Sequence, residues 1–241
     1  MTNAVPPRLD ELGTVLTIWA HPDDEAYLAG GLLAALTDAG QRAVCVTATR
    51  GESADPGATE EERMALASVR TAELAASMAV LGVTEHHWLD LPDSGCADLD
   101  PSGPVDRLVA IMDDVQPDTV VTFGPDGFTG HPDHRAVSRW TDLALERTGA
   151  GGPRLWHAVA QESLLDREIA EQFGVYALGE PRFCSDDELS LRLSLSGVPL
   201  ERKVRSLLSQ ASQTGGLAEA VGIERFSAWV ATECFAPPVT R

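Results

Sequence analysis

Two short segments rich in histidine and aspartate each follow an apolar run. The first, Ala-His-Pro-Asp-Asp-Glu at 20–25, comes directly after the apolar residues 14–19. The second, Gly-His-Pro-Asp-His at 130–134, follows the apolar residues 119–123. Apolar runs of this length predict buried strands. In an open α/β sheet, the turns after the strands lie at the edge where ligands bind. We therefore expect the two segments to face each other across one edge of one sheet.

Strand-like and helix-like segments alternate strictly along the first 160 residues. Further strands are expected at 42–49, 86–91 and 154–160, and helices at 25–36, 59–81, 105–115 and 134–147. Thr59 and Glu62 have the spacing of a capping box at the start of one of these helices, and Gly82 is its expected end. The alternation predicts an α/β fold with a mostly parallel sheet that is covered by helices on both faces.

The pattern changes after residue 161. A short helix is expected at 164–173, a strand at the sheet edge at 189–195, and two more helices at 199–213 and 217–230. No linker divides the chain, so we expect one domain over residues 1–241. Its core covers about residues 13–161. A C-terminal α+β elaboration of about residues 162–241 encloses one side of the site.

Composition excludes several classes of protein. The net charge of −19 argues against a nucleic acid or an anionic membrane as partner. Residues 1–10 lack a secretion signal and no apolar run reaches membrane-spanning length, which predicts a cytoplasmic protein. The 4 cysteines form no CxxC pair, so neither a thiolate zinc site nor a disulfide framework is expected. The sequence is compatible with a homo-oligomer.

The two motifs contain the side chains that a catalytic metal site needs. His21, Asp24 and His134 would form a His₂Asp ligand set with a position left open for water. One Zn²⁺ per chain is expected, with Fe²⁺ or another divalent ion as the alternative. A nearby carboxylate can take a proton from that water, and an imidazolium can support the oxyanion or the leaving amine. Asp23 and His131 adjoin the ligands, so the set is complete for hydrolysing an amide.

Helix capping is the alternative explanation for such a motif. Aspartate is a favoured N-cap residue, and negative charge suits a helix N-terminus. Two separate histidine–acid turns, each at a strand end, are difficult to explain by capping. We therefore favour the metal site.

With these motifs the chain resembles the LmbE-like, or PIG-L, family of metal-dependent de-N-acetylases. The resemblance covers about residues 14–140 and is supported by Gly51-Glu52, Arg70 with Glu73, Leu81-Gly82-Val83, Pro92-Asp93-Ser94-Gly95 and Pro117-Asp118. It implies a Rossmann-like three-layer sandwich. It also implies zinc bound by His21, Asp24 and His134, with Asp23 as general base and His131 stabilising the tetrahedral intermediate.

The resemblance also implies substrate-binding residues. Arg70 and Asp93 match positions that hold sugar hydroxyls in members acting on N-acetylglucosamine units, and a guanidinium and a carboxylate offer complementary contacts to a sugar. The alternative for Arg70 is a surface ion pair with Glu73 or Glu62. The remaining candidate contacts are Glu52 and Thr129.

The expected function is that of a zinc-dependent hydrolase. It would remove an N-acetyl or other N-acyl group from an amino-sugar-containing small molecule, in secondary-metabolite or thiol-sugar metabolism. One alternative is a mycothiol S-conjugate amidase, which is disfavoured because Thr129 stands where those enzymes carry tyrosine. Another is a non-catalytic sugar-binding protein, which would need an incomplete set of motif residues.

Three polar loops, 50–58, 92–104 and 125–130, are expected to form the rim of the cleft. They contain few large apolar residues. Such a rim suits a hydroxylated ligand and suits a lipid or an acyl chain poorly.

Overall fold

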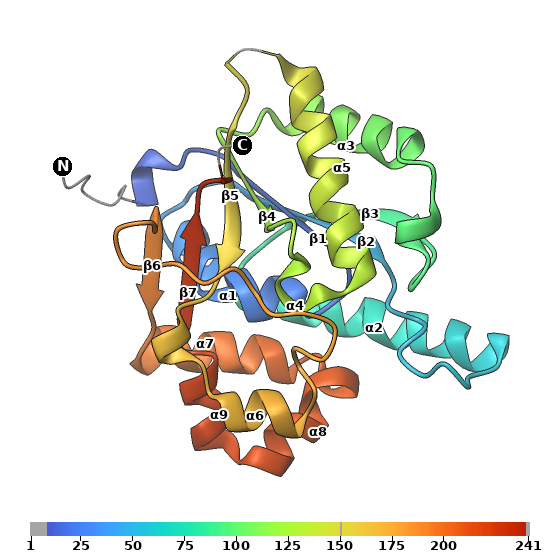
Figure 1. Cartoon of the computed structure of the whole chain (residues 1–241), viewed down its shortest axis with the longest axis vertical. Helices are drawn as coiled ribbons and strands as arrows, with labels where there is room; N and C mark the ends of the chain where they lie inside the picture. Colours follow the sequence, from blue (N-terminus) through green and yellow to red (C-terminus); the bar gives the residue numbers. More distant parts are fainter. Residues whose placement is uncertain (1–8, 150, 240–241) are drawn as a thin grey trace.

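The computed structural model describes residues 9–149 and 151–239, so most of the segment on which the expected cytoplasmic location rests lies outside the described residues. Its centre is a seven-stranded sheet with the order β3-β2-β1-β4-β5-β7-β6 (Figure 1). The strands are β1 (Val15–Trp19), β2 (Ala43–Thr49), β3 (Glu85–Leu91), β4 (Thr119–Phe123), β5 (Arg154–Val159), β6 (Leu191–Ser194) and β7 (Thr232–Ala236). The first five pair in parallel, and β7 runs antiparallel to both β5 and β6. The predicted α/β fold is confirmed.

Helices pack on both faces of this sheet. They are α1 (Asp24–Asp38), α2 (Glu60–Leu81), α3 (Ser102–Val115), α4 (Gly127–Gly130), α5 (Pro132–Thr148), α6 (Arg167–Gln172), α7 (Gly197–Leu208), α8 (Ala211–Val221) and α9 (Ile223–Trp229). Helices α1, α2 and α7 pack on one another, as do α3 and α5. Helices α6, α8 and α9 gather beyond one end of β7, beside α7 (Figure 1).

The strands at the centre of the sheet are buried along their whole length. Every residue of β1, β2 and β4 is buried, which explains why their sequences are continuous apolar runs instead of alternating ones. Trp19 and Phe123 meet edge to face, with ring centroids 5.0 Å apart. The chain passes from β1 outward to β3 and then returns to β4 on the other side of β1. This reversal of strand order creates a crevice between the ends of β1 and β4.

Helix α2 begins and ends as the sequence predicts. Thr59 and Glu62 form the capping box, and Gly82 ends the helix with a left-handed φ of 79°. Among the described helices, α2 alone is long and apolar enough to cross a membrane by length and composition. One such helix is weak support for a membrane span, and α2 packs against α1 and α7.

The C-terminal third differs from the prediction in two ways. The segments 199–213 and 217–230 form three helices instead of two, since the chain breaks at Ser209–Gln210 and again at Gly222. The break at Gln210 turns its side chain inward to donate to Oε1 of Glu25 at 2.6 Å. Gly222, with a φ of 81°, starts a new helix.

Strand β7 is the second difference, because the sequence pattern predicts no strand there. It lies between β5 and the edge strand β6, so one sheet contains strands from both sides of residue 161. The boundary proposed there between core and elaboration stays a prediction. Glu233 of β7 accepts hydrogen bonds from the backbone N–H groups of Gly31 and Leu32 at 2.6 and 2.9 Å. Glu233 also pairs with the fully buried Lys203 at 2.7 Å, which joins β7 to α1 and α7.

Candidate active site

The crevice between β1 and β4 brings three predicted ligands together. Nδ1 of His21 lies 3.2 Å from Nε2 of His134. Oδ2 of Asp24 lies 3.7 Å from the first of these nitrogens, and Oδ1 of Asp24 lies 3.4 Å from the second. Ligand atoms bound at 2.0–2.2 Å to one tetrahedral ion lie about 3.3–3.6 Å apart. The three side chains therefore lie close to the spacing of ligands around one divalent ion.

The other nitrogen of each ligand imidazole has a partner that orients its ring. Nδ1 of His134 lies 2.9 Å from the carbonyl oxygen of Gly127, to which it donates. Nε2 of His21 lies 3.1 Å from Oδ1 of Asp93 and 3.3 Å from Oδ2 of Asp133. Such second partners fix the tautomer so that the facing nitrogen keeps its lone pair for a metal.

Two other groups of side chains are close enough to compete for a metal. One replaces Asp24 with His131, and the other combines His21 with Asp93 and Asp133. Nδ1 of His131, however, accepts the N–H of Asp133 at 3.2 Å. The Asp133 carboxylate in turn accepts backbone N–H groups at 2.7 and 3.1 Å. In the predicted set, Oδ1 of Asp24 faces His134, and Oδ2 faces His21 while also accepting its backbone N–H at 2.8 Å. The choice of Asp24 as the third ligand stays a prediction.

The carboxylates around His21 make the site attractive to a cation. Burial opposes a charge on His21, but hydrogen bonds to Asp133 and Asp93 outweigh it and raise its pKa to about 10. Burial lowers the pKa of His134 to about 4, so this ring is neutral at pH 7. A divalent ion at Nδ1 of His21 would take the place of the proton and supply the positive charge that the carboxylates favour.

Asp23 is held beside the ligands in a strained conformation. Its φ of 101° is rare for a residue other than glycine, and such strain gathers at functional sites. Although Asp23 is the N-cap residue of α1, its side chain makes no capping hydrogen bond. Capping therefore does not explain this aspartate. Burial raises the pKa of Asp23 to about 7, with Arg70 opposing the shift and Asp24 adding to it. A carboxylate with this pKa is suited to accept a proton near neutral pH.

His131 is oriented by its position as N-cap residue of α5. Since its Nδ1 accepts the N–H of Asp133, the proton of the neutral ring sits on Nε2. Burial lowers the pKa of His131, and the charge of His21 adds to this effect. The ring can therefore donate its Nε2–H to an oxygen that gains negative charge.

Arg70 lies beneath Asp23 instead of on the surface. It is only 5% exposed and donates to the carbonyl oxygens of Gly51 and Pro22. Its Nη2 is 3.4 Å from Oδ2 of Asp23. The alternative of a surface ion pair is wrong, because Glu73 accepts hydrogen bonds from Ser212 of α8 and Glu62 belongs to the capping box of α2. A sugar contact by Arg70 stays a prediction.

The other predicted substrate residues also have partners within the protein. Asp93 accepts the N–H of Ser53 at 2.7 Å in addition to its contact with His21. Glu52 accepts the N–H of Asp93 at 3.0 Å, which steadies this loop. The hydroxyl oxygen of Thr129 lies 3.3 Å from Nδ1 of His134. Their contacts with substrate stay predictions.

Asp133 has no predicted role, although it belongs to the second motif. Its side chain is fully buried and links Ser94, Cys96 and His21. The sequence feature that could have indicated a role for Asp133 is its position between two histidines at the start of a helix. Such a position suits a carboxylate that orients a metal ligand.

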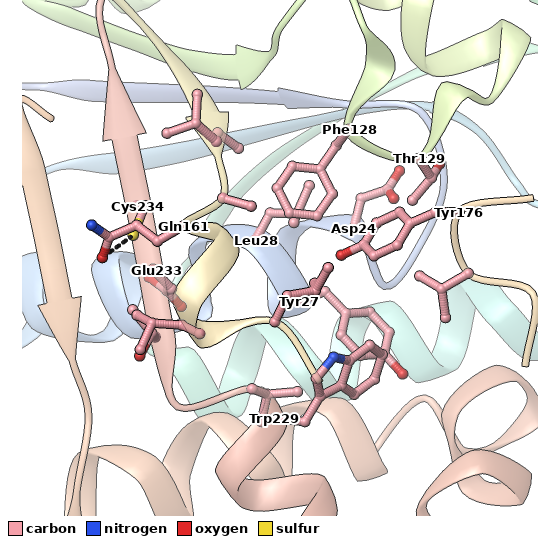
Figure 2. Close-up of a pocket in the computed structure, with 18 of the residues that line it drawn as sticks. Asp24, Tyr27, Leu28, Phe128, Thr129, Gln161, Tyr176, Trp229, Glu233 and Cys234 are labelled. Carbon is pink, nitrogen blue, oxygen red and sulfur yellow. Dashed lines mark hydrogen bonds between the residues drawn. The ribbon is translucent and has the colours of Figure 1, made fainter. Parts of the chain in front are cut away.

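A cavity of about 390 Å³ opens beside the ligands (Figure 2). Asp23, Asp24, Thr129 and His134 line its end at the site, and much of the rest comes from residues beyond 161. The predicted polar rim is therefore wrong for this cavity. Loops 50–58 and 92–104 supply none of its lining residues, and residues 125–130 supply Phe128 and Thr129.

The fold and the site together define an α/β protein with a candidate histidine–carboxylate metal site at the switch point of its sheet. The chain belongs to the PIG-L family, whose profile, described as GlcNAc-PI de-N-acetylase, matches residues 16–145. It is 32% identical over 236 residues to a 1D-myo-inositol 2-acetamido-2-deoxy-alpha-D-glucopyranoside deacetylase of Mycobacterium sp. (strain JLS), covering 86% of this chain and 76% of that protein.

Solved structures share this fold at low sequence identity. The conserved protein TT1542 of Thermus thermophilus superposes with a TM-score of 0.62 at 22% identity, covering 93% of this chain and 94% of that one. The N,N'-diacetylchitobiose deacetylase of Pyrococcus horikoshii gives a TM-score of 0.59 at 20% identity, covering 94% and 84%.

Proposed function

We propose that the protein is a zinc-dependent hydrolase that removes an N-acetyl or other N-acyl group from an amino-sugar-containing small molecule. The observation that carries the proposal is the spacing of the donor atoms of His21, Asp24 and His134 with Asp23 beside them. The mycobacterial relative is named as a deacetylase of an acetamido sugar, which supports the substrate class. A cytoplasmic location in secondary-metabolite or thiol-sugar metabolism is part of the same proposal.

His21, Asp24 and His134 would hold the ion, and Fe²⁺ is the alternative to Zn²⁺ for the same donors. When bound, the ion would lower the pKa of a water molecule and polarise the amide carbonyl. The buried carboxylates of Asp93 and Asp133 keep the ring of His21 oriented for this role.

Asp23 accepts the proton of the attacking water. Its raised pKa, about 7, gives it the basicity for this step, and Arg70 fixes the carboxylate from below. His131 donates from Nε2 to the carbonyl oxygen as negative charge develops there. The proton taken up by Asp23 is then available for the leaving amine.

Asp93, Glu52, Thr129 and Arg70 remain our candidates for polar contacts to the sugar. Asp93 and Glu52 lie on the side of His21 away from the cavity, and Thr129 lies at the cavity end beside His134. The two sides of the metal site thus differ in polarity.

Two other functions can be separated from this one by assay. A mycothiol S-conjugate amidase would release the amine only from a thiol-sugar conjugate, and a sugar-binding protein would release none. The zinc-loaded enzyme should instead release free amine from N-acylated glucosamines and their glycosides, detected by mass spectrometry.

The same assay tests the assignment of the base. Asp23→Asn should retain a full equivalent of metal but lose activity by a factor of about 10²–10⁴. Asp114→Asn, a matched change on the exposed face of α3, serves as the control. Normal turnover by Asp23→Asn with its metal bound would show that Asp23 is not the base.

A further inference from the structure

The cavity beside the site has an apolar lining. Four aromatic side chains, Tyr27, Phe128, Tyr176 and Trp229, surround it (Figure 2). Ring centroids lie 5.8 Å apart for Tyr27 and Trp229 and 6.4 Å apart for Phe128 and Tyr176. The aliphatic lining residues are Leu28, Val159, Leu164, Leu165, Val175, Leu217 and Val230.

The charged and amide side chains at the far end are already engaged within the protein. Glu233 is 2% exposed and pairs with Lys203. Gln161 donates to Asp186 at 2.7 Å, and its carbonyl oxygen faces Cys234 (Figure 2). The lining also includes the hydroxyl-bearing residues Tyr27, Tyr176 and Thr232, but most of it consists of aromatic and aliphatic carbon atoms, which favours an apolar group over a hydroxylated one.

One lining residue is held there at a cost in backbone strain. Phe128 has φ 61° and ψ −48°, which lies outside the helical region although the residue falls within α4. The side chain of Asp126 accepts the N–H of Phe128 at 2.7 Å and holds this turn. In this conformation the phenyl ring of Phe128 reaches the cavity one residue before Thr129 (Figure 2). Strain of this kind persists where a side chain has a functional place.

The position of the cavity indicates which half of the substrate enters it. It opens at Asp24 and His134, whereas the polar loop with Asp93 and Glu52 lies beyond His21. A scissile amide at the metal has a sugar on its nitrogen side and an acyl group on its carbonyl side. Matching polarity places the sugar toward the polar loop and the acyl group in the cavity.

The cavity is much larger than an acetyl group requires. An apolar cavity of about 150 Å³ is enough to bind benzene, and this one measures about 390 Å³. An acetyl group would fill it with a single methyl and leave most of the aromatic lining without contact.

We propose that the acyl group removed is an apolar chain several carbons longer than acetyl. This inference rests on the proposed N-deacylase function and specifies its substrate. Each further methylene buried in the cavity should raise kcat/KM by about fourfold until the cavity is full.

The test is a series of N-acetyl-, N-butyryl-, N-hexanoyl- and N-octanoylglucosamine assayed with the zinc-loaded enzyme. We expect kcat/KM to rise along the series by at least about tenfold. Leu165→Asp, which places a carboxylate in the cavity wall, should remove this rise. Leu178→Asp is the matched control, because Leu178 lies in the same connecting region, is 61% exposed and does not line the cavity. It should keep the rise.

Each other outcome has a definite meaning. A kcat/KM that is flat or falls from acetyl to octanoyl would overturn the inference and leave the N-deacylase function standing. A gain from an octyl aglycone on N-acetylglucosamine, without a gain from a longer acyl group, would place the other end of the substrate in the cavity and also overturn it. Failure to hydrolyse any acylated sugar, acetyl included, would overturn the proposed function together with the inference.

Discussion

Nη2 of Arg70 lies 3.4 Å from Oδ2 of Asp23, and the same guanidinium donates to the backbone carbonyls of Gly51 and Pro22. Arg70 thus joins the loop after β2 to the turn after β1 directly beneath the proposed base. Its burial makes this contact stronger than a surface ion pair, because water screens it less.

Arg70→Ala should therefore lower kcat more than it raises KM. Without the guanidinium, the carboxylate of Asp23 loses its fixed orientation, and we expect kcat to fall about tenfold or more while KM stays within about twofold. Steady-state kinetics with metal content measured in parallel will check this. Arg63→Ala on the same helix is the control. A large rise in KM with kcat unchanged would instead favour the sugar contact that the family resemblance implies for Arg70.

The metal assignment predicts a change in stoichiometry. His134→Ala removes one of three donor atoms, so the purified variant should hold well under one equivalent of metal. His87→Ala on β3, outside the site, should hold a full equivalent. Elemental analysis after dialysis against a dilute chelator is the measurement. A full equivalent bound by His134→Ala would remove this residue from the ligand set.

Asp133 should tune metal affinity without touching the metal. Asp133→Asn keeps the shape of the side chain but removes the charge that orients His21, and loss of such a partner typically costs about 10–100-fold in metal affinity. Competition with a chromogenic chelator measures the change, with Asp114→Asn as the matched surface control. An unchanged affinity would show that Asp93 alone orients the ring.

His157 should make stability depend on pH. This histidine of β5 is 3% exposed, neither ring nitrogen has a hydrogen-bond partner among the described residues, and burial lowers its pKa to about 4. Between pH 6.5 and 4 the unfolded chain binds a proton at this residue and the folded protein does not. The free energy of unfolding therefore falls as pH falls through this window, by about 3 kcal/mol from this residue.

His157→Leu should flatten that dependence. Urea unfolding of the metal-free protein at several pH values across this window will show whether wild type loses more stability than the variant on acidification. Metal-free protein is used because proton competition for the ligands would otherwise contribute. Equal slopes for the two proteins would mean that His157 can be protonated in the folded state.

The sequence was sufficient to predict the parallel half of the fold for a physical reason. Strands β1, β2 and β4 are buried on both faces. Such strands have continuous apolar sequences, because neither face requires the polar residues that alternate with apolar ones in a half-exposed strand. The motifs at 20–25 and 130–134 follow two of them, and the reversal of strand order between β1 and β4 brings them together. The sequence could therefore indicate that these two motifs meet, and their assignment as metal ligands stays a prediction.

What could not be predicted depends on contacts distant in sequence. Strand β7 has five residues and acquires its conformation by pairing with both β5 and β6. The role of Arg70 as a partner of Asp23 depends on the position of the loop after β2. The sequence alone does not distinguish a buried arginine from an exposed one. The apolar cavity combines side chains from α1, α4, α8 and α9, and no local pattern indicates that these would meet.

The order of strands at the far edge of the sheet sets an order of events during synthesis. Strand β6 leaves the ribosome before β7, yet β7 is the strand with which it pairs among the described strands. Until β7 is inserted beside β5, Lys203 has no Glu233 to neutralise it, and the wall of the cavity beyond Gln161 cannot close. The parallel strands and both motifs precede β7 in the chain, so a nascent chain would hold the candidate catalytic groups in an open crevice until Thr232, Glu233 and Cys234 complete the far end of the cavity.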